Sequence, residues 1–505
     1  MNIKQAKEYI KNTVQLYLKK NEFGEYRIPV VRQRPIFLLG APGIGKTAIM
    51  EQIAQEMGIA LVSYSMTHHT RQSALGLPFI TEKIYGGEKY SVSEYTMSEI
   101  ISSVYETMEN SGMQEGILFL DEINCVSETL APSMLQFLQY KVFGRHKVPE
   151  GWVVVTAGNP PEYNKSVREF DVVTLDRLKI LEVEPDLRVW KEYASDRQLH
   201  NAVLSYLDLK KEHFYCMEMT VKGRSYVTAR GWEDLSQVLS LYEEAGLAVD
   251  ETLVGQYLRN DKVVKEFTAY YDLYNKYKRD YHIEEILNGN PSVEAVERAK
   301  QAAFDERLSL LGMLLDRVQA DMKSVCEQAA YITDLRKLLQ PLGEKAKEET
   351  AEQFAEELKQ LLEKRRKMLA GLRSANSLSD TDLRKHNLVN RFLEEAAKGI
   401  FLGDCKDGVS AYASVKEKYA SLVAQMKNET EQTKAQLHCL FAFVEEAFAE
   451  GNEMLILVTE LTVNQYSSGF IAMFGSADYT RHNEEMMLSE RGDGIREEIL
   501  KLGLE

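Results

Sequence analysis

The segment Gly40–Thr47 constrains this chain more than any other feature of its sequence. It reads Gly-Ala-Pro-Gly-Ile-Gly-Lys-Thr, follows the apolar run Ile36–Leu39 and precedes helix-forming residues from Ala48 onward. A strand, a glycine-rich turn and a helix in this order form a P-loop. There, backbone N–H groups and the positive end of the helix surround a polyphosphate. The segment therefore predicts a nucleotide site.

Two side chains of the P-loop have distinct expected roles. Lys46 should contact the β- and γ-phosphates, and the Thr47 hydroxyl should bind Mg²⁺. The residues that we expect to line the nucleotide are Gly40, Ala41, Pro42, Gly43, Ile44, Gly45, Lys46, Thr47 and Ala48.

A second apolar run, Ile117–Leu120, ends in the carboxylates Asp121 and Glu122. Continuous apolar runs are typical of buried parallel strands. Because ligands lie at the carboxyl ends of such strands, we expect both carboxylates beside the P-loop. Asp121 should hold Mg²⁺, directly or through water, and Glu122 should orient the attacking water or accept its proton.

Three further segments predict strands, at residues 60–65, 152–157 and 180–183, and the second of them reads as a buried strand. Asn159 follows the second of them and could bond the attacking water or the γ-phosphate; the alternative is an ordinary turn asparagine before proline. Residues 141–148 predict a β-hairpin. The segment Arg27–Val31 could contact a base or simply pack as a linker, and both alternatives stay open.

The whole-chain composition excludes several classes of protein. The net charge of −16 argues against a general nucleic-acid coat, because phosphate binding needs clustered cations. No apolar run approaches the ~20 residues that span a bilayer, and the N-terminus lacks the apolar core of a signal peptide. Five scattered cysteines show no metal spacing or disulfide framework, which favours reduced thiols in the cytoplasm.

The second half of the chain predicts long helices with heptad-like apolar spacing. Pro341 and Gly343 predict a chain reversal between the first two of them. Helices of 30–40 residues would run ~45–60 Å, giving an elongated bundle. We therefore expect three parts: an α/β nucleotide-binding domain at 1–185, a helical lid at 186–248, and a coiled-coil-like helical extension at 249–505.

Taken together, residues 35–245 resemble the AAA+ ATPases and, within them, the MoxR family. The order of the P-loop, Asp-Glu, Ala-Gly-Asn-Pro, Leu-Asp-Arg and a lid arginine carries the resemblance. It implies a parallel sheet flanked by helices, a helical lid and hydrolysis of ATP with Mg²⁺. It also implies that Asn159 is sensor 1, that Arg177 is a finger acting on a neighbour's ATP, and that Arg230 is the sensor 2 arginine.

Two departures from the family pattern leave alternatives. Leu178 stands where phenylalanine is usual after the finger, and Thr228-Ala229-Arg230 replaces the common Ser-Pro-Arg. Arg224 is therefore a rival of Arg230, and Arg168 is a weaker rival of Arg177.

A finger that acts in trans implies a homo-oligomer, by resemblance a hexameric ring. The resemblance also implies a chaperone-like role in remodelling or maturing a partner, often a von Willebrand factor A domain protein. Two other functions are weighed: a nucleic-acid-stimulated motor and a nucleotide-binding scaffold without turnover. The acidic charge counts against the motor, and the set of Asp121, Glu122, Asn159 and Arg177 counts against the scaffold.

Overall fold

The computed structural model describes residues 1–68, 74, 76–143, 145–163, 167, 170–220, 223–402, 405–448 and 452–486. The described chain divides into two compact units. The first holds Met1–Val189 and Lys359–Arg391, and the second holds Trp190–Leu358 and the chain from Phe392 onward. The expected division into three parts at residues 185 and 248 stays a prediction.

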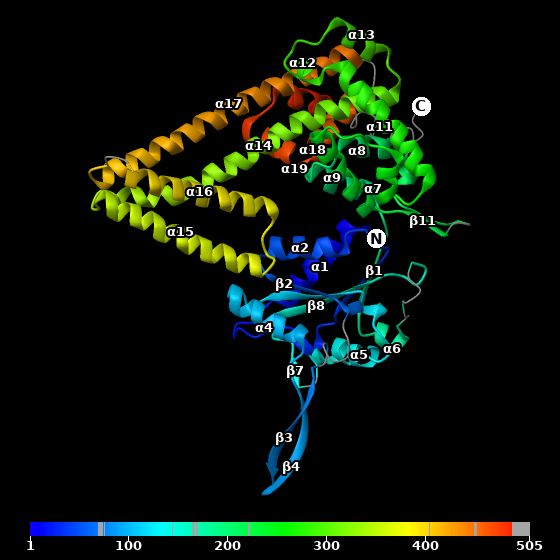
Figure 1. Ribbon diagram of the computed structural model, residues 1–505, viewed down its shortest axis with the longest axis vertical. Coiled ribbons are helices and arrows are strands. Elements are labelled where there is room, and N and C mark those ends of the chain that lie inside the picture. Colours follow the sequence, from blue (N-terminus) through cyan, green and yellow to red (C-terminus); the bar gives the residue numbers. More distant parts are fainter. Residues whose placement is uncertain are drawn as a thin grey trace, which may run out of the picture. The chain divides into compact units, whose positions relative to one another are not determined.

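A five-stranded parallel sheet forms the centre of the first unit (Figure 1), with strand order β2-β5-β8-β1-β9. Its core strands are continuous apolar runs, as expected for a sheet covered on both faces; every residue of β8 is buried. This sheet and its flanking helices confirm the predicted α/β P-loop fold class. The strands are β1 (Ile36–Gly40), β2 (Ala60–Ser65), β5 (Gly116–Asp121), β8 (Trp152–Gly158) and β9 (Lys179–Val183).

Helices of the first unit cover this sheet and form its core with it. An amphipathic helix near the N-terminus begins with a capping box at Asn2 and packs on the helix that follows the P-loop. The helices are α1 (Ile3–Tyr17), α2 (Lys46–Met57), α4 (Glu99–Ser111), α5 (Ala131–Tyr140) and the short α6 (Val172–Leu175).

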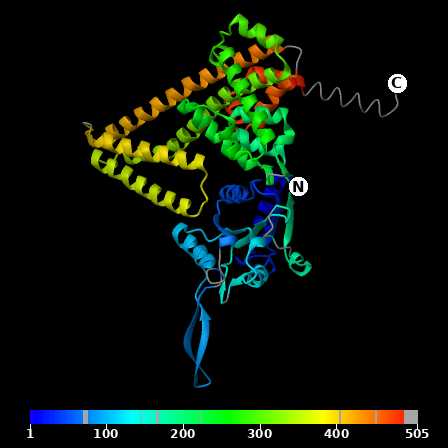
Figure 2. The same ribbon diagram turned by 45° about the vertical axis from the view of Figure 1, so that its right-hand side comes forward.

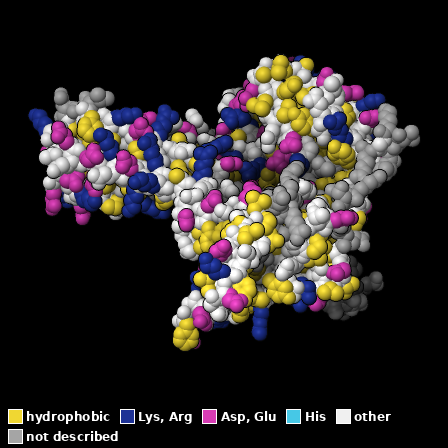
Figure 3. Space-filling model, turned by 60° about the horizontal axis from the view of Figure 1, so that its bottom comes forward, with side chains coloured by type: hydrophobic (Ala, Val, Ile, Leu, Met, Phe, Trp, Pro, Cys, Tyr) yellow, Lys and Arg dark blue, Asp and Glu magenta, His cyan; other side chains and the backbone are white. Residues whose placement is uncertain are grey.

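Two antiparallel hairpins interrupt this pattern. The predicted hairpin at 141–148 is present as β6 (Val142–Phe143) and β7 (His146–Lys147). The longer hairpin, β3 (Pro78–Tyr85) with β4 (Glu88–Tyr95), extends away from the sheet in both Figure 1 and Figure 2. It exposes large apolar side chains of the kind drawn yellow in Figure 3. These are Phe79, Ile80, Ile84, Tyr85, Tyr90 and Tyr95.

Lys141 joins the end of α5 to the chain that enters β1. Its side chain is buried, and its ammonium donates to the carbonyls of Val30 at 2.5 Å and Gln33 at 2.7 Å. Its backbone is left-handed, with φ of 56°. No carboxylate among the described residues pairs with it, so burial dominates and lowers the pKa of Lys141 to about 7.

Replacing Lys141 with methionine should remove a pH dependence from the stability of the first unit. The pKa of this lysine is 10.5 in its ordinary state and about 7 when folded. Between these values the unfolded chain holds one proton more than the folded chain. Wild-type stability should therefore rise with pH by up to ~1.4 kcal/mol per pH unit, and this contribution is lost as the pH falls to 7.

Urea midpoints at pH 7, 8 and 9 measure this difference between the wild type and Lys141→Met. The matched control is Lys147→Met, because Lys147 lies exposed on β7. An equal pH slope in the wild type and in Lys141→Met would contradict the prediction.

The second unit is mainly helical, with one β-hairpin. Its elements are α7 (Leu187–Asp196, which begins in the first unit), α8 (Asn201–Leu209), β10 (Cys216–Thr220), β11 (Gly223–Val227), α9 (Ala229–Ala245), α10 (Glu251–Tyr257), α11 (Asp261–Tyr281), α12 (Ile283–Leu287), α13 (Val293–Gln301), α14 (Phe304–Lys345), α17 (Gly408–Phe448), α18 (Glu453–Val463) and α19 (Gln465–Phe474). Two more helices, α15 (Ala351–Ser374) and α16 (Asp380–Leu402), run through both units along the chain.

The longest helices, α14 and α17, have 42 and 41 residues and pack against each other. The heptad-like spacing in α14 was correctly predicted, since most of its apolar positions are buried. The predicted reversal at Pro341 and Gly343 is wrong. The helix continues through Pro341 to Lys345, because Leu339 and Leu342 on either side of the proline remain buried in the packing. Within the described part of the chain, no helix combines the length and apolarity that crossing a membrane requires.

Candidate active site

The P-loop lies between the last residue of β1 and the first residue of α2. Gly43 and Gly45 have φ of 73° and 92°, left-handed values that favour glycine. Gly40 is required for a different reason: a Cβ there would lie 2.7 Å from the carbonyl oxygen of Val183 on β9. The glycines therefore permit the turn that brings the N-terminus of α2 to the carboxyl end of the sheet.

Lys46 is held inside this loop. Its ammonium donates to the carbonyls of Gly40 and Ala41, both at 2.8 Å, and to Oδ1 of Asn159 at 2.9 Å. Asn159 reaches Lys46 because β8, which it follows, lies next to β1 in the sheet. The strand order thus joins the P-loop lysine to an asparagine that is distant in the sequence.

Thr47 and Asp121 meet at the carboxyl end of the sheet. The Thr47 hydroxyl donates to Oδ2 of Asp121 at 3.1 Å, and Oδ1 of Asp121 accepts from the backbone N–H of Glu122 at 2.9 Å. Mg²⁺ takes oxygen ligands and is bound by one or two carboxylates together with substrate phosphates. The Thr47 hydroxyl and Oδ2 of Asp121 lie close enough to each other to bind the same Mg²⁺ ion.

Glu122 is turned toward β2. Its Oε2 accepts from the hydroxyls of Ser65 at 3.1 Å and Thr67 at 3.0 Å. β2 borders β5 on the side away from β8 and β1, so these bonds hold the carboxylate on the side opposite the P-loop strand. Glu122 also has a left-handed backbone, with φ of 55°. The sequence analysis gave neither Ser65 nor Thr67 a role in holding Glu122, because single hydroxyls at a strand end give no pattern that would reveal such a contact.

Asn124 fixes the backbone of Asn159. It is buried, and its Nδ2 donates to the carbonyl of Asn159 at 2.8 Å. The side chain packs so closely on Gly158 that a Cβ there would lie 2.4 Å from Oδ1 of Asn124. Sequence analysis missed this residue, although its place two residues after Glu122 could have raised it as a candidate.

Replacing Asn124 with aspartate should lower ATP turnover about tenfold or more. The substitution keeps the shape but puts a carboxylate oxygen against the Asn159 carbonyl, which loses its buried donor at a cost of about 1–3 kcal/mol. Steady-state ATPase assays measure the change. Glu128→Gln, four residues further along the chain and exposed, is the control. Turnover at the wild-type rate in Asn124→Asp would remove Asn124 from the positioning of Asn159.

The segment Arg27–Val31 is tied down through its backbone, because Gln33 and Lys141 donate to the carbonyls of Ile28 and Val30. The side chains of Arg27, Pro29 and Val31 are exposed. Contact with a base and ordinary packing as a linker both stay predictions for this segment.

The predicted arginines are placed as follows. Arg177 is exposed after α6, and within the described chain no hydrogen bond or ion pair engages its guanidinium. Arg230 is the exposed second residue of α9, whose N-cap is Thr228, and it belongs to the second unit. Arg224 lies in β11, with its side chain outside the described part of the structure, and Arg168 lies outside the described residues. The roles of all four stay predictions.

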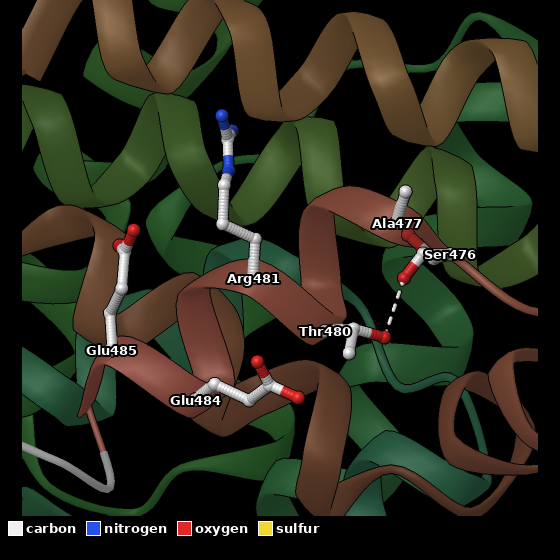
Figure 4. Close-up of a pocket in the computed structure, with 6 residues that line it drawn as sticks. All are labelled: Ser476, Ala477, Thr480, Arg481, Glu484 and Glu485. Atoms are coloured by element: carbon white, nitrogen blue, oxygen red, sulfur yellow. Dashed lines mark hydrogen bonds between the residues drawn. The ribbon is translucent and has the colours of Figure 1, made fainter.

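A shallow pocket on the second unit is unrelated to these residues (Figure 4). It is lined by Ser476, Ala477, Thr480, Arg481, Glu484 and Glu485. The guanidinium of Arg481 in this pocket pairs with the carboxylates of Glu445 at 2.5 Å and Asp478 at 3.6 Å. We therefore assign this pocket no role in the chemistry.

A comparison with protein families matches residues 36–173 to the model of the ATPase family associated with various cellular activities, AAA. The match begins at the first residue of β1 and includes Lys46, Thr47, Asp121, Glu122 and Asn159. No curated protein matches the chain. Together with the geometry of the P-loop and the sheet, this match shows that residues 36–173 carry an AAA-type ATPase domain.

Proposed function

We propose that this protein is a MoxR-like ATPase that hydrolyses ATP to remodel, assemble or mature a partner protein. One observation carries the ATPase part: the sheet brings Lys46, Asn159, Thr47 and Asp121 into direct hydrogen bonds at the P-loop. Such a set binds a triphosphate and its metal at one point, which is the requirement for phosphoryl transfer to water.

In the proposed mechanism each side chain acts at a defined place. Lys46 neutralises charge on the β- and γ-phosphates, and Asn159 orients the attacking water or the γ-phosphate. Thr47 and Asp121 would hold Mg²⁺, which when bound would offset phosphate charge. Glu122 accepts the proton of the attacking water, and to do so it leaves Ser65 and Thr67 and turns toward the P-loop.

The proposed active unit is a homo-oligomer, a hexameric ring by family resemblance. The exposed guanidinium of Arg177 supports this, since a finger must be available to another subunit. Arg230 is proposed as the sensor 2 arginine that contacts phosphate from the lid. The proposed location is the cytoplasm.

The hairpin β3–β4 supports a protein partner. Ile80 and Ile84 are 78% and 66% exposed on a two-stranded ribbon, and clustered exposed apolar side chains mark protein-binding surfaces. The partner class implied by the resemblance is a von Willebrand factor A domain protein.

The test measures ATPase activity of the full chain alone, with DNA, with RNA, and with a von Willebrand factor A protein. A pull-down with Glu122→Gln as a trap, repeated with Ile80→Ser and Ile84→Ser added, identifies the bound partner and its contact. Stimulation by DNA or RNA alone would favour the nucleic-acid motor instead. Nucleotide binding without turnover under every condition would favour the scaffold.

A further inference from the structure

The edge of the ATPase sheet is covered by a turn that lies far along the sequence, between α15 and α16. β2 is an edge strand, and edge strands present unpaired backbone groups unless something covers them. The backbone N–H of Leu61 on β2 donates to the carbonyl of Ala375 at 2.9 Å. Ala375 lies in the turn between α15 and α16. This turn belongs to the first unit.

This turn is packed into the first unit. Ala375 has no exposed surface and belongs to the same apolar cluster as Leu118 and Leu120 of β5. Next to it, Nε2 of Gln55 on α2 donates to the carbonyl of Leu378 at 3.3 Å. A Cβ on Gly371 would lie 3.4 Å from the carbonyl oxygen of Asn110 at the end of α4. The turn is thus held by α2, β2 and α4 together.

The same strand holds the catalytic carboxylate at its other end. Four residues beyond Leu61, or about 13 Å along the strand, the Ser65 hydroxyl donates to Glu122, and Thr67 adds a second bond. β2 is paired with β5 along its full length, from Ala60 to Ser65. One continuous strand therefore links the docking site of the turn at Leu61 to the hydroxyls that hold Glu122.

We propose that the turn around Ala375 is a positioning element for Glu122, acting through β2. While the turn is docked on Leu61, β2 presents Ser65 and Thr67 to Glu122 and holds the carboxylate away from the P-loop. When the turn is released, this hold weakens and Glu122 turns to the attacking water. The two-state element is the Glu122 side chain, and both the turn and the nucleotide bias it. This inference rests on the proposed role of Glu122.

The helices on either side make the turn suitable for this role. α15 and α16 each continue along the chain into the second unit. The turn is therefore continuous along the chain with helical segments of the second unit.

Two variants of different severity release the turn. Ala375→Leu overfills a fully buried position, and Gln55→Ala removes only the bond to the Leu378 carbonyl. Glu51→Ala is the matched control for the latter, since Glu51 is exposed on the same helix. Hydrogen exchange of the Leu61 amide reports docking directly, and steady-state kinetics report kcat and KM.

We expect faster exchange at Leu61 and a kcat raised about threefold or more in both variants, because a hydrogen-bonded restraint of this kind changes an equilibrium by about that factor. The KM for ATP should stay within about twofold, and Glu51→Ala should match the wild type. If Ala375→Leu does not fold, Gln55→Ala alone decides. Faster exchange at Leu61 with an unchanged kcat would overturn the proposal.

A double-mutant cycle separates positioning from general destabilisation. Ser65→Ala with Thr67→Val removes the bonds to Glu122 and should itself raise kcat about tenfold. In that background Gln55→Ala and Ala375→Leu should have no further effect on kcat, because the hold that they act through is gone. If the turn variants raise kcat by the same factor with and without Ser65→Ala and Thr67→Val, the turn acts by another route.

Measurements on Glu122→Gln distinguish failure of the positioning role of the turn from failure of the proposed ATPase function. If the wild-type protein and Glu122→Gln turn over ATP equally, the role of Glu122 is wrong, and Leu61 exchange still reports docking. If Glu122→Gln is inactive but the cycle is additive, the proposed function stands and only the positioning role of the turn fails.

Discussion

Replacing Glu122 with glutamine should reduce ATP turnover by about 10²–10⁴-fold, the range typical of lost general base catalysis, while ATP remains bound. Glutamine keeps the size of the side chain and can still accept from Ser65 and Thr67, but it cannot take a proton from water. The fold and the P-loop contacts of Lys46 and Thr47 do not involve this carboxylate. Turnover should therefore fall without a matching loss of affinity.

Steady-state ATPase assays and equilibrium titration with a fluorescent ATP analogue measure the two quantities separately. The control is Glu150→Gln, an exposed glutamate before β8. A wild-type rate in Glu122→Gln would remove Glu122 from the mechanism. A loss of nucleotide affinity equal to the loss of rate would assign it to binding instead.

Replacing Arg177 with alanine should lower turnover by about 10³-fold or more, since arginine fingers in GTPases contribute 10³–10⁵. Nucleotide affinity of the isolated subunit should change little, because the guanidinium is expected to act on a neighbour's site. Arg168→Ala, the rival, should keep most of the activity. The reverse result would transfer the role to Arg168.

A mixing experiment tests whether the finger acts in trans. Glu122→Gln and Arg177→Ala should each have strongly reduced turnover alone. A mixed oligomer contains sites in which an intact Glu122 from one variant meets an intact Arg177 from the other, so activity should return on mixing. No recovery, with both variants assembled to the size of the wild type, would indicate a finger that acts within its own subunit.

The sequence was sufficient for features that depend on a few neighbouring residues. A P-loop needs glycines at fixed places between a strand and a helix, so Gly40–Thr47 could be recognised without knowledge of the rest. Buried parallel strands appear as apolar runs, which located β1, β5 and β8. Long helices with heptad-like spacing were found for the same reason, although Pro341 was wrongly expected to end one of them.

No local sequence pattern shows which side chains contact Asn159 and Glu122 in the folded protein. Asn124 donates to the Asn159 carbonyl because β8 lies beside β5, and Glu122 points toward Ser65 because β2 lies on the other side. Strand order is a property of the folded sheet, so neither contact follows from spacing. The buried Lys141, which has only backbone carbonyls as partners, likewise looked like an ordinary hairpin lysine.

The sequence by itself therefore determined that this protein has a phosphate-binding loop, two carboxylates at a strand end and a mainly helical second half. Only the tertiary structure decided which side chains hold Glu122 and that the turn at Ala375 covers the edge of the ATPase sheet. The physical reason is that turn geometry and apolar periodicity act over a few residues. Contacts between distant segments are set by how whole strands and helices pack.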